Sequence, residues 1–158
     1  MLAILLYGCE IWCLTEALLE RLRVFHAHCL RAMARVTRLH TWRHHISTQD
    51  LGRRLGIDTI DAHVSRRQLR WLGHVRRMSF DRLPRRMLSS WVASKRPRGA
   101  PKMTYGRSIA KALAKFNVDA ALWPDLAADR QAWAETLRLG RPAIRRSVRV
   151  AQRKGPAS

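Results

Sequence analysis

Residues 66–78 read Arg66-Arg67-Gln68-Leu69-Arg70-Trp71-Leu72-Gly73-His74-Val75-Arg76-Arg77-Met78, and helical spacing divides this run into two faces. Arg66, Arg70 and Arg77 fall within roughly 40° of one another and span about 16 Å of helix axis. The opposite side collects the apolar residues Ile60, Val64, Trp71, Leu72, Val75 and Met78. One side can therefore pack on a core, while the other can meet several phosphates of a nucleic acid.

The composition supports a polyanionic partner. The 158 residues include 31 Lys and Arg against 11 Asp and Glu, which gives a formal net charge of +20. Nucleic acid is the first expectation for a partner, and an anionic membrane surface is the second. A chain of this length predicts one domain that buries roughly 68–70% of its unfolded surface.

Helix signals without convincing strand alternation predict an all-α fold, an irregular bundle of about five or six helices with a basic disordered tail. Thr15 is expected to cap a helix that ends near Arg38, and a polar loop is expected to follow it. Further helices are expected between Thr48 and Gly56, from Thr59, from Pro84 to Trp91, from Thr104 and from Pro124. In the first helix the stripe expected to face inward is Leu18, Leu22, Phe25, Cys29, Met33 and Val36.

Three regions are predicted along the chain. Residues 1–14 look like the remnant end of a larger element that lies upstream, and residues 15–138 are expected to form a helical nucleic-acid-binding domain with an exposed Pro/Arg arm at 92–103. Residues 139–158 form the basic disordered tail, which can serve as a nuclear-import signal. The apolar start is shorter than the about 20 residues of a membrane span and makes a poor signal peptide. The expected location is therefore intracellular, in the nucleus, with no membrane partner.

The predicted site consists of basic side chains. On the long helix the nucleic-acid contacts are expected at Arg66, Arg67, Arg70, His74 and Arg77, and in the arm at Lys95, Arg96, Arg98 and Lys102. Structural roles are expected for Trp71, Cys29, Asp129, Arg130 and Trp133. Arg130 shares a predicted stripe with Leu126, Trp133 and Leu137, so we expect it to be drawn toward the core, paired with a carboxylate or stacked on an indole.

No catalytic or metal centre is predicted, because the acidic residues include no adjacent pair of the kind that two-metal nucleotidyl transfer uses. Cys9, Cys13, His26 and Cys29 offer an alternative zinc site, but their spacing matches no usual finger, and free cysteines are commonly buried. Asp58 and Asp61 offer a second metal alternative, against the ordinary role of helix-start carboxylates as partners of the helix dipole.

Several strings in a fixed order resemble one family. They are Tyr7-Gly8-Cys9-Glu10-Ile11-Trp12, Cys29-Leu30-Arg31, residues 67–78, Leu83-Pro84-Arg85-Arg86, residues 95–104 and Ala128-Asp129-Arg130-Gln131-Ala132-Trp133. The set resembles the C-terminal thumb and post-thumb region of non-LTR (LINE-type) retrotransposon endonuclease-reverse transcriptases. Ile11, Ala100, Tyr105 and Ala134 depart from the pattern, as expected of a divergent or decayed copy.

The resemblance implies a fragment that binds template RNA or RNA–DNA duplex and whose partner is an upstream polymerase palm. The family's catalytic aspartates have no matching positions here, so the chain is expected to be inactive alone and to carry no cofactor. Mg²⁺ is implied only for the full-length RNA-directed DNA polymerase.

Two alternatives stay open. A stand-alone helix-turn-helix protein would direct Gln68 or His74 at base edges of DNA. An inert structural remnant would instead be prone to aggregate, because the apolar start at Ala3, Ile4, Leu5 and Leu6 would lack a packing partner.

Overall fold

The computed structural model describes residues 2–93 and 104–140, and for residues 89–93 it describes the backbone only. The described residues form helices and no strands, so the predicted all-α class is confirmed. The longer helices are α2 (Glu16–Met33), α4 (Thr48–Leu55), α5 (Ile60–Arg76), α6 (Leu83–Ala93), α7 (Tyr105–Lys115) and α9 (Arg130–Leu139). Shorter turns are α1 (Leu2–Leu5), the 3-10 turn η1 (Cys9–Ile11), α3 (Arg38–Arg43) and α8 (Trp123–Leu126).

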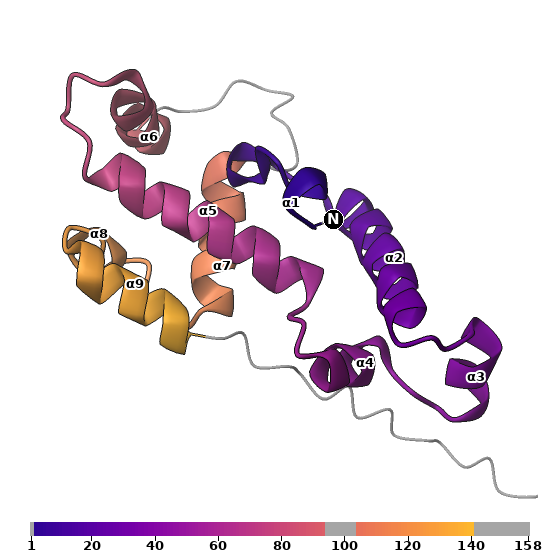
Figure 1. The fold of residues 1–158 in the computed structure, drawn as a ribbon. Coiled ribbons are helices and arrows are strands. Elements are labelled where there is room, and N and C mark those ends of the chain that lie inside the picture. Colours follow the sequence, from indigo (N-terminus) through magenta and orange to yellow (C-terminus); the bar gives the residue numbers. More distant parts are fainter. Residues whose placement is uncertain (1, 94–103, 141–158) are drawn as a thin grey trace, which may run out of the picture.

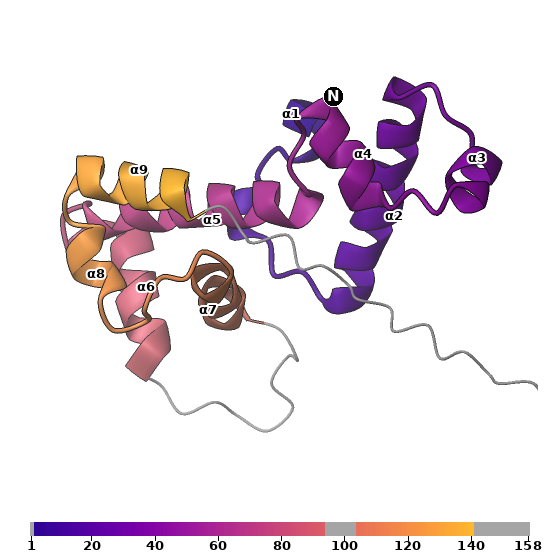
Figure 2. The ribbon, with the colours of Figure 1, turned by 90° about the horizontal axis from the view of Figure 1, so that it is seen from below.

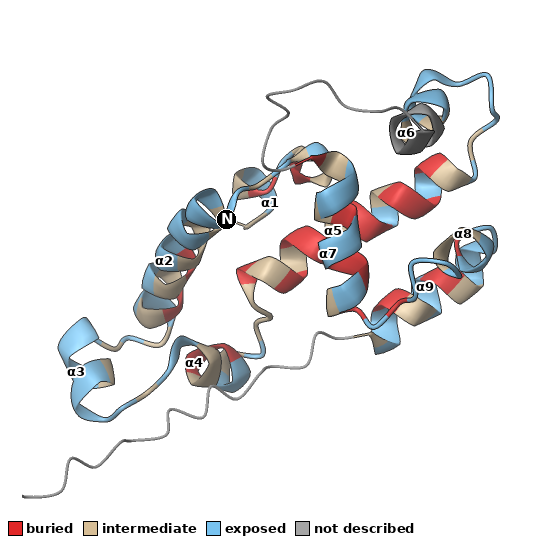
Figure 3. Ribbon diagram, turned by 180° about the vertical axis from the view of Figure 1, so that it is seen from behind, coloured by how far each residue is buried: buried red, intermediate tan, exposed pale blue. Residues whose placement is uncertain are grey.

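Helix α5 is the centre of the fold, and α2, α6, α7, α9 and η1 all pack against it (Figures 1 and 2). Its buried residues therefore lie on several sides of the helix (Figure 3) and are Ile60, Ala62, Val64, Ser65, Gln68, Leu69, Leu72, Gly73 and Val75. The predicted apolar side holds for Ile60, Val64, Leu72 and Val75, whereas Trp71 and Met78 are only half-buried.

The larger core lies between α5, α7 and α9. Leu69 and Leu72 are fully buried there against the α7 side chains and the indole of Trp133. The other members of this core are Ile109, Ala112, Leu113, Phe116, Val118, Ala127 and Leu137. This core fixes α9 beside α5.

The N-terminal segment packs on the first half of α5. Leu6 and Cys9 are buried with Ile60 and Val64 in a second core. The expectation that the apolar start lacks a partner is thus wrong for Leu6, although Ile4 is 85% exposed.

Helix caps follow the sequence signals closely. The hydroxyls of Thr15, Thr59 and Thr104 each accept an amide hydrogen bond from the first turn, as predicted. Helix α4 differs by one residue, since Ser47 rather than Thr48 is its cap. Ser47 and Asp50 form a reciprocal capping box, which satisfies two amides at once.

The predicted inward stripe of α2 is only partly correct, because Leu22 packs against the second core whereas three other members of the stripe are exposed. Leu18, Phe25 and Met33 are 44%, 44% and 51% exposed, and the buried residues of the helix are His26 and Leu30. On the side of α2 that packs, the guanidinium of Arg23 donates to Asp61 of α5 at 2.7 and 2.8 Å. Burial of α2 follows the side that faces α5 and α4, not the longest apolar stripe.

Two other expectations need correction. Residues after α2, predicted as a polar loop, form α3, which Thr37 caps through the amide of His40. The single helix predicted from Pro124 is broken into α8 and α9, because the side chain of Asp129 accepts from the amides of Gln131 and Ala132 and starts a new helix. Residues 94–103, with most of the predicted arm, and residues 141–158 of the predicted tail lie outside the described residues.

Candidate nucleic-acid interface

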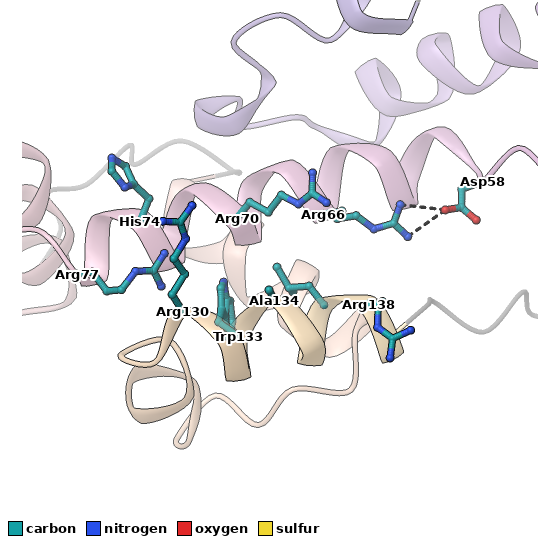
Figure 4. A pocket seen from close by; sticks show the side chains of 10 residues that line it. Asp58, Arg66, Arg70, His74, Arg77, Arg130, Trp133, Ala134 and Arg138 are labelled. Atoms are coloured by element: carbon teal, nitrogen blue, oxygen red, sulfur yellow. Dashed lines mark hydrogen bonds and ion pairs between the residues drawn. The ribbon is translucent and has the colours of Figure 1, made fainter.

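A groove of about 740 Å³ runs between α5 and α9 (Figure 4). Helix α5 contributes Arg66, Arg70, His74 and Arg77, and α9 contributes Arg130, Trp133, Ala134, Leu137 and Arg138; Asp58 lies at one end. Five arginines therefore share the groove with one lining carboxylate. The alignment of Arg66, Arg70 and Arg77 that helical spacing predicted is present.

Arg66 is the least exposed arginine of the groove, with 20% of its side chain accessible. Both of its terminal nitrogens donate to Asp58 at 3.0 Å, and its guanidinium carbon lies 5.9 Å from the ring centre of Phe116. These contacts fix the side chain and offset part of the positive charge at this end of the groove.

Arg70 and Arg77 are exposed on the same side of α5. Arg77 is oriented by a hydrogen bond of 2.7 Å to the main-chain oxygen of Ala127. Arg70 has no ion-pair partner in the described part of the chain, so its charge is available to a ligand. His74 is also exposed, and its ring lies 5.3 Å from that of Trp71.

Arg130 does not turn toward the core. It is exposed at the first turn of α9, and Figure 4 shows its side chain extending toward the part of α5 that carries His74 and Arg77. The predicted common stripe with Leu126 fails because the two residues belong to different helices. Arg130 therefore adds to the wall of the groove.

Other predicted residues lie elsewhere. Arg67 does not line the groove but binds the N-terminal segment, where its guanidinium donates to the main-chain oxygen of Leu6 at 3.0 Å and forms an ion pair with Glu10 at 3.5 Å. Cys29 is half-buried on α2 rather than in the core. Asp129 caps α9, and Trp133 is 3% exposed under the groove. Lys95, Arg96, Arg98 and Lys102 lie outside the described residues.

Sequence reasoning missed Arg138, which the same groove includes. It lies eight residues after Arg130 on α9, and its guanidinium donates two hydrogen bonds, of 2.6 and 2.9 Å, to the carboxylate of Glu135. The signal was present in the spacing, because residues eight apart share a helix face. The expectation that Arg130 faces the core hides this relation between Arg130 and Arg138.

The helix-turn-helix alternative directs Gln68 or His74 at base edges, and the structure contradicts it for Gln68, while His74 is exposed. Gln68 is 2% exposed, and its amide nitrogen donates to the oxygen of Trp12 at 2.9 Å and to the hydroxyl of Ser108 at 3.2 Å. With partners on several sides, α5 cannot enter a major groove as a recognition helix.

Within residues 2–93 and 104–140, no group of three or more His, Cys, Asp or Glu side chains is placed to hold a metal ion. Cys9 is buried in the smaller core, and burial raises the pKa of its thiol. Burial disfavours the charged form of Asp61, but hydrogen bonds from Arg23 and from Lys115 at 3.0 Å outweigh it and hold the pKa at about 2. Cys9 and Asp61, one residue from each metal alternative, therefore have structural roles in the described part of the chain.

None of the helices in the described ranges is long and apolar enough to cross a bilayer.

Comparison with known proteins gives one informative match. The chain is 28% identical over 143 residues to a Caenorhabditis elegans protein whose name describes it as uncharacterized and transposon-derived. The match covers 87% of this chain and 51% of that protein, so the chain spans about half the length of this relative. No family model and no solved structure matches the chain. The similarity indicates a transposon origin.

Proposed function

We propose that this chain is the nucleic-acid-binding part of a retroelement protein and that the groove between α5 and α9 holds a sugar-phosphate backbone. The observation that carries the proposal is the convergence of five arginines from two helices on one open groove. Guanidinium groups match phosphate oxygens in geometry and stay charged at any physiological pH. The apolar side chains of Trp133 and Leu137 line the groove between the arginines of α5 and those of α9.

The overall charge of +20 supports the same proposal. Each phosphate neutralised by a basic side chain releases counterions, so binding to a polyanion relieves the self-repulsion of a strongly basic protein. Arg70 and Arg130, which have no ion-pair partner in the described ranges, are the side chains best placed to do this.

The ordered sequence strings support a finer assignment, the C-terminal thumb-like part of a non-LTR retrotransposon reverse transcriptase. The transposon-derived relative supports it as well. In this assignment the ligand is template RNA or RNA–DNA duplex, the partner is the polymerase palm of the full-length protein, and the protein acts in the nucleus. Magnesium-dependent polymerisation then belongs to the palm, since the described residues gather no set of metal ligands.

The test is the salt dependence of binding. Affinity of the purified chain for RNA, DNA duplex and RNA–DNA duplex is measured by fluorescence anisotropy between about 50 and 200 mM salt. The logarithm of affinity should fall linearly with the logarithm of salt concentration. The double variant Arg70→Ala/Arg130→Ala should bind more weakly, with the duplex DNA slope reduced by up to about 1.8.

A matched control is Arg21→Ala/Arg54→Ala, which removes the same charge from exposed positions outside the groove. The control variant should lose less affinity than the groove variant, and both variants should have the melting temperature of the parent protein. A salt slope near zero would contradict nucleic-acid binding. Equal losses of affinity in the two double variants would show that the groove is not the binding site.

A further inference from the structure

Helix α3 and the turn after it form an exposed surface of aromatic and basic side chains, called here the Trp42 surface. Trp42 is 72% exposed and Leu39 is 54% exposed. The remaining members of the surface are Arg38, Arg43, His44 and His45, all exposed. Helix α3 lies at one end of the molecule, beyond α2 and α4, and α9 lies at the opposite end in both Figure 1 and Figure 2.

This surface is locally well fixed. The hydroxyl of Thr37 accepts from the amide of His40 at 3.1 Å, and the amide of Ile46 donates to the oxygen of Thr41 at 2.9 Å. Helix α3 ends at Arg43 with His44 as its C-cap, and the following residue, His45, is a non-glycine residue in the left-handed region with φ of 49°. Trp42 is thus exposed on a short helix whose two ends are fixed by hydrogen bonds. In the described part of the chain its indole stacks on no other aromatic ring and contacts no cation.

The charge around Trp42 has one sign. From Arg21 to Gln49 the sequence contains arginines and histidines but no acidic residue. Arg35, Arg38 and Arg43 have no ion-pair partner among the described residues. Such a region attracts an anion, and none of its residues lines the α5/α9 groove.

We propose that the Trp42 surface binds an unpaired stretch of RNA or DNA, with a base stacked on the indole and the flanking phosphates paired with Arg38 and Arg43. This inference rests on the proposed function and adds a second contact to it. Arg38 lies one helical turn before Trp42 and therefore shares its face of α3, whereas Arg43 is the next residue and begins about 100° around the helix. Aromatic platforms flanked by basic residues are how proteins hold single strands.

The geometry favours unpaired nucleotides over a duplex. A protruding indole stacks only on a base whose face is open, and in a duplex both faces of each base are covered by its neighbours. An anionic lipid surface fits less well, because interfacial helices carry a broad apolar face. In α3 the large exposed apolar side chains are Leu39 and Trp42.

The experiment compares single-stranded RNA of about 16 nucleotides with a blunt duplex of the same sequence. Trp42→Ala should weaken binding to the single strand by roughly 5- to 150-fold, the range that loss of one stacked base implies. Trp42→Phe should retain most of the affinity because it keeps an aromatic face. Duplex binding should stay within about twofold of the parent protein in both variants.

Tyr7→Ala is the matched control, since Tyr7 is 84% exposed at the N-terminal segment and outside the Trp42 surface. It should bind both nucleic acids like the parent. As an independent readout, single-stranded RNA should quench indole fluorescence of the parent more than that of Trp42→Phe. Equal quenching in the two proteins would contradict stacking on Trp42.

The outcomes separate this inference from the proposed function. If Trp42→Ala binds the single strand like the parent while Arg70→Ala/Arg130→Ala loses affinity, the Trp42 surface is overturned and the groove stands. If Trp42→Ala loses single strand and duplex equally, recognition of unpaired bases is overturned. If it loses binding only to phosphatidylserine vesicles, the surface is a lipid contact. If the parent binds no nucleic acid at low salt, both proposals fall.

Discussion

The indole nitrogen of Trp133 donates a hydrogen bond of 3.0 Å to the main-chain oxygen of Leu69. Both residues are buried, at 3% and 0% exposed, so the bond lies in the larger core. An indole N–H buried without a partner would be costly, and the bond therefore fixes how α9 sits on α5. This contact therefore joins the two helices that form the walls of the arginine groove.

Gly73 lies directly under the same indole, and a methyl group there cannot be accommodated. An added Cβ would overlap the indole nitrogen of Trp133. Gly73→Ala should lower the free energy of unfolding by about 1–3 kcal/mol, as overpacking does, despite the better helix propensity of alanine. Urea unfolding measures this. Gly106→Ala is the control, since nothing lies within 4 Å of its added Cβ, and it should be neutral or stabilising.

Asp61 should control the acid stability of the protein. Its pKa is about 2 in the folded state against an ordinary value of 3.8, and its side chain is 19% exposed. A depressed carboxyl pKa contributes stability that is complete above pH 3.8 and is lost as the pH falls toward 2. Asp61→Asn should lose about 2 kcal/mol at neutral pH and show a flatter pH profile in this window. Circular dichroism during acid titration measures it.

Asp125→Asn provides the comparison for Asp61→Asn, because Asp125 is exposed on α8 and has no ion pair in the described ranges. This variant should unfold in acid like the parent. An unchanged acid profile for Asp61→Asn would show that the contacts of Asp61 with Arg23 and Lys115 add nothing to stability.

His26 should make the protein less stable in mild acid. Burial lowers its pKa, with a further contribution from His63 that exceeds the opposing effect of Asp61, and its buried Nε2 has no hydrogen-bond partner among the described residues. Because the folded state binds the proton less well, stability should be complete above the ordinary pKa of 6.5 and fall as the pH drops through the folded pKa. Urea midpoints at several pH values measure the slope.

His26→Leu should remove part of that slope while keeping the helix packed. His28→Leu, at an exposed position of the same helix, should keep the whole slope. If the two variants behave alike, the pH dependence arises at other groups, of which His63 is the first to replace.

Asp58 should limit the affinity of the groove for nucleic acid, because it engages Arg66 through two hydrogen bonds of 3.0 Å. Asp58→Asn keeps the shape of the side chain and removes its charge. Binding should become tighter, and the salt slope for duplex DNA steeper by up to about 0.9. Glu20→Gln makes the same charge change on α2, outside the groove, and should alter the slope less. Weaker binding by Asp58→Asn would show that Arg66 must be held in place to contact phosphate.

Local rules predicted much of the secondary structure. Hydroxyl caps at Thr15, Thr59 and Thr104 involve residues three positions apart, so their geometry is encoded in short stretches of sequence. Gly56, with a φ of 65°, ends α4 for a similar local reason. The alignment of Arg66, Arg70 and Arg77 also follows from helical spacing alone.

The orientation of α2 could not be predicted in this way. The predicted stripe combines Leu22, which packs on the second core, with Leu18 and Phe25, which are exposed. Periodicity cannot show which of these side chains has a partner. The side of α2 that packs also carries Arg23, which pairs with Asp61, 38 residues further along the chain, when α2 packs on α5.

The all-α class, the strong positive charge and the row of arginines on α5 can be derived from the order of residues, because they depend on composition and on spacing within one helix. The packing of the helices determines that Arg130 and Arg138 face that row, that Arg67 and Gln68 do not join it, and that Trp42 is exposed. The contacts that decide this, such as Trp133 with Leu69, join residues 64 positions apart. Their partners are chosen by the fit of whole helices around α5, which no local pattern records.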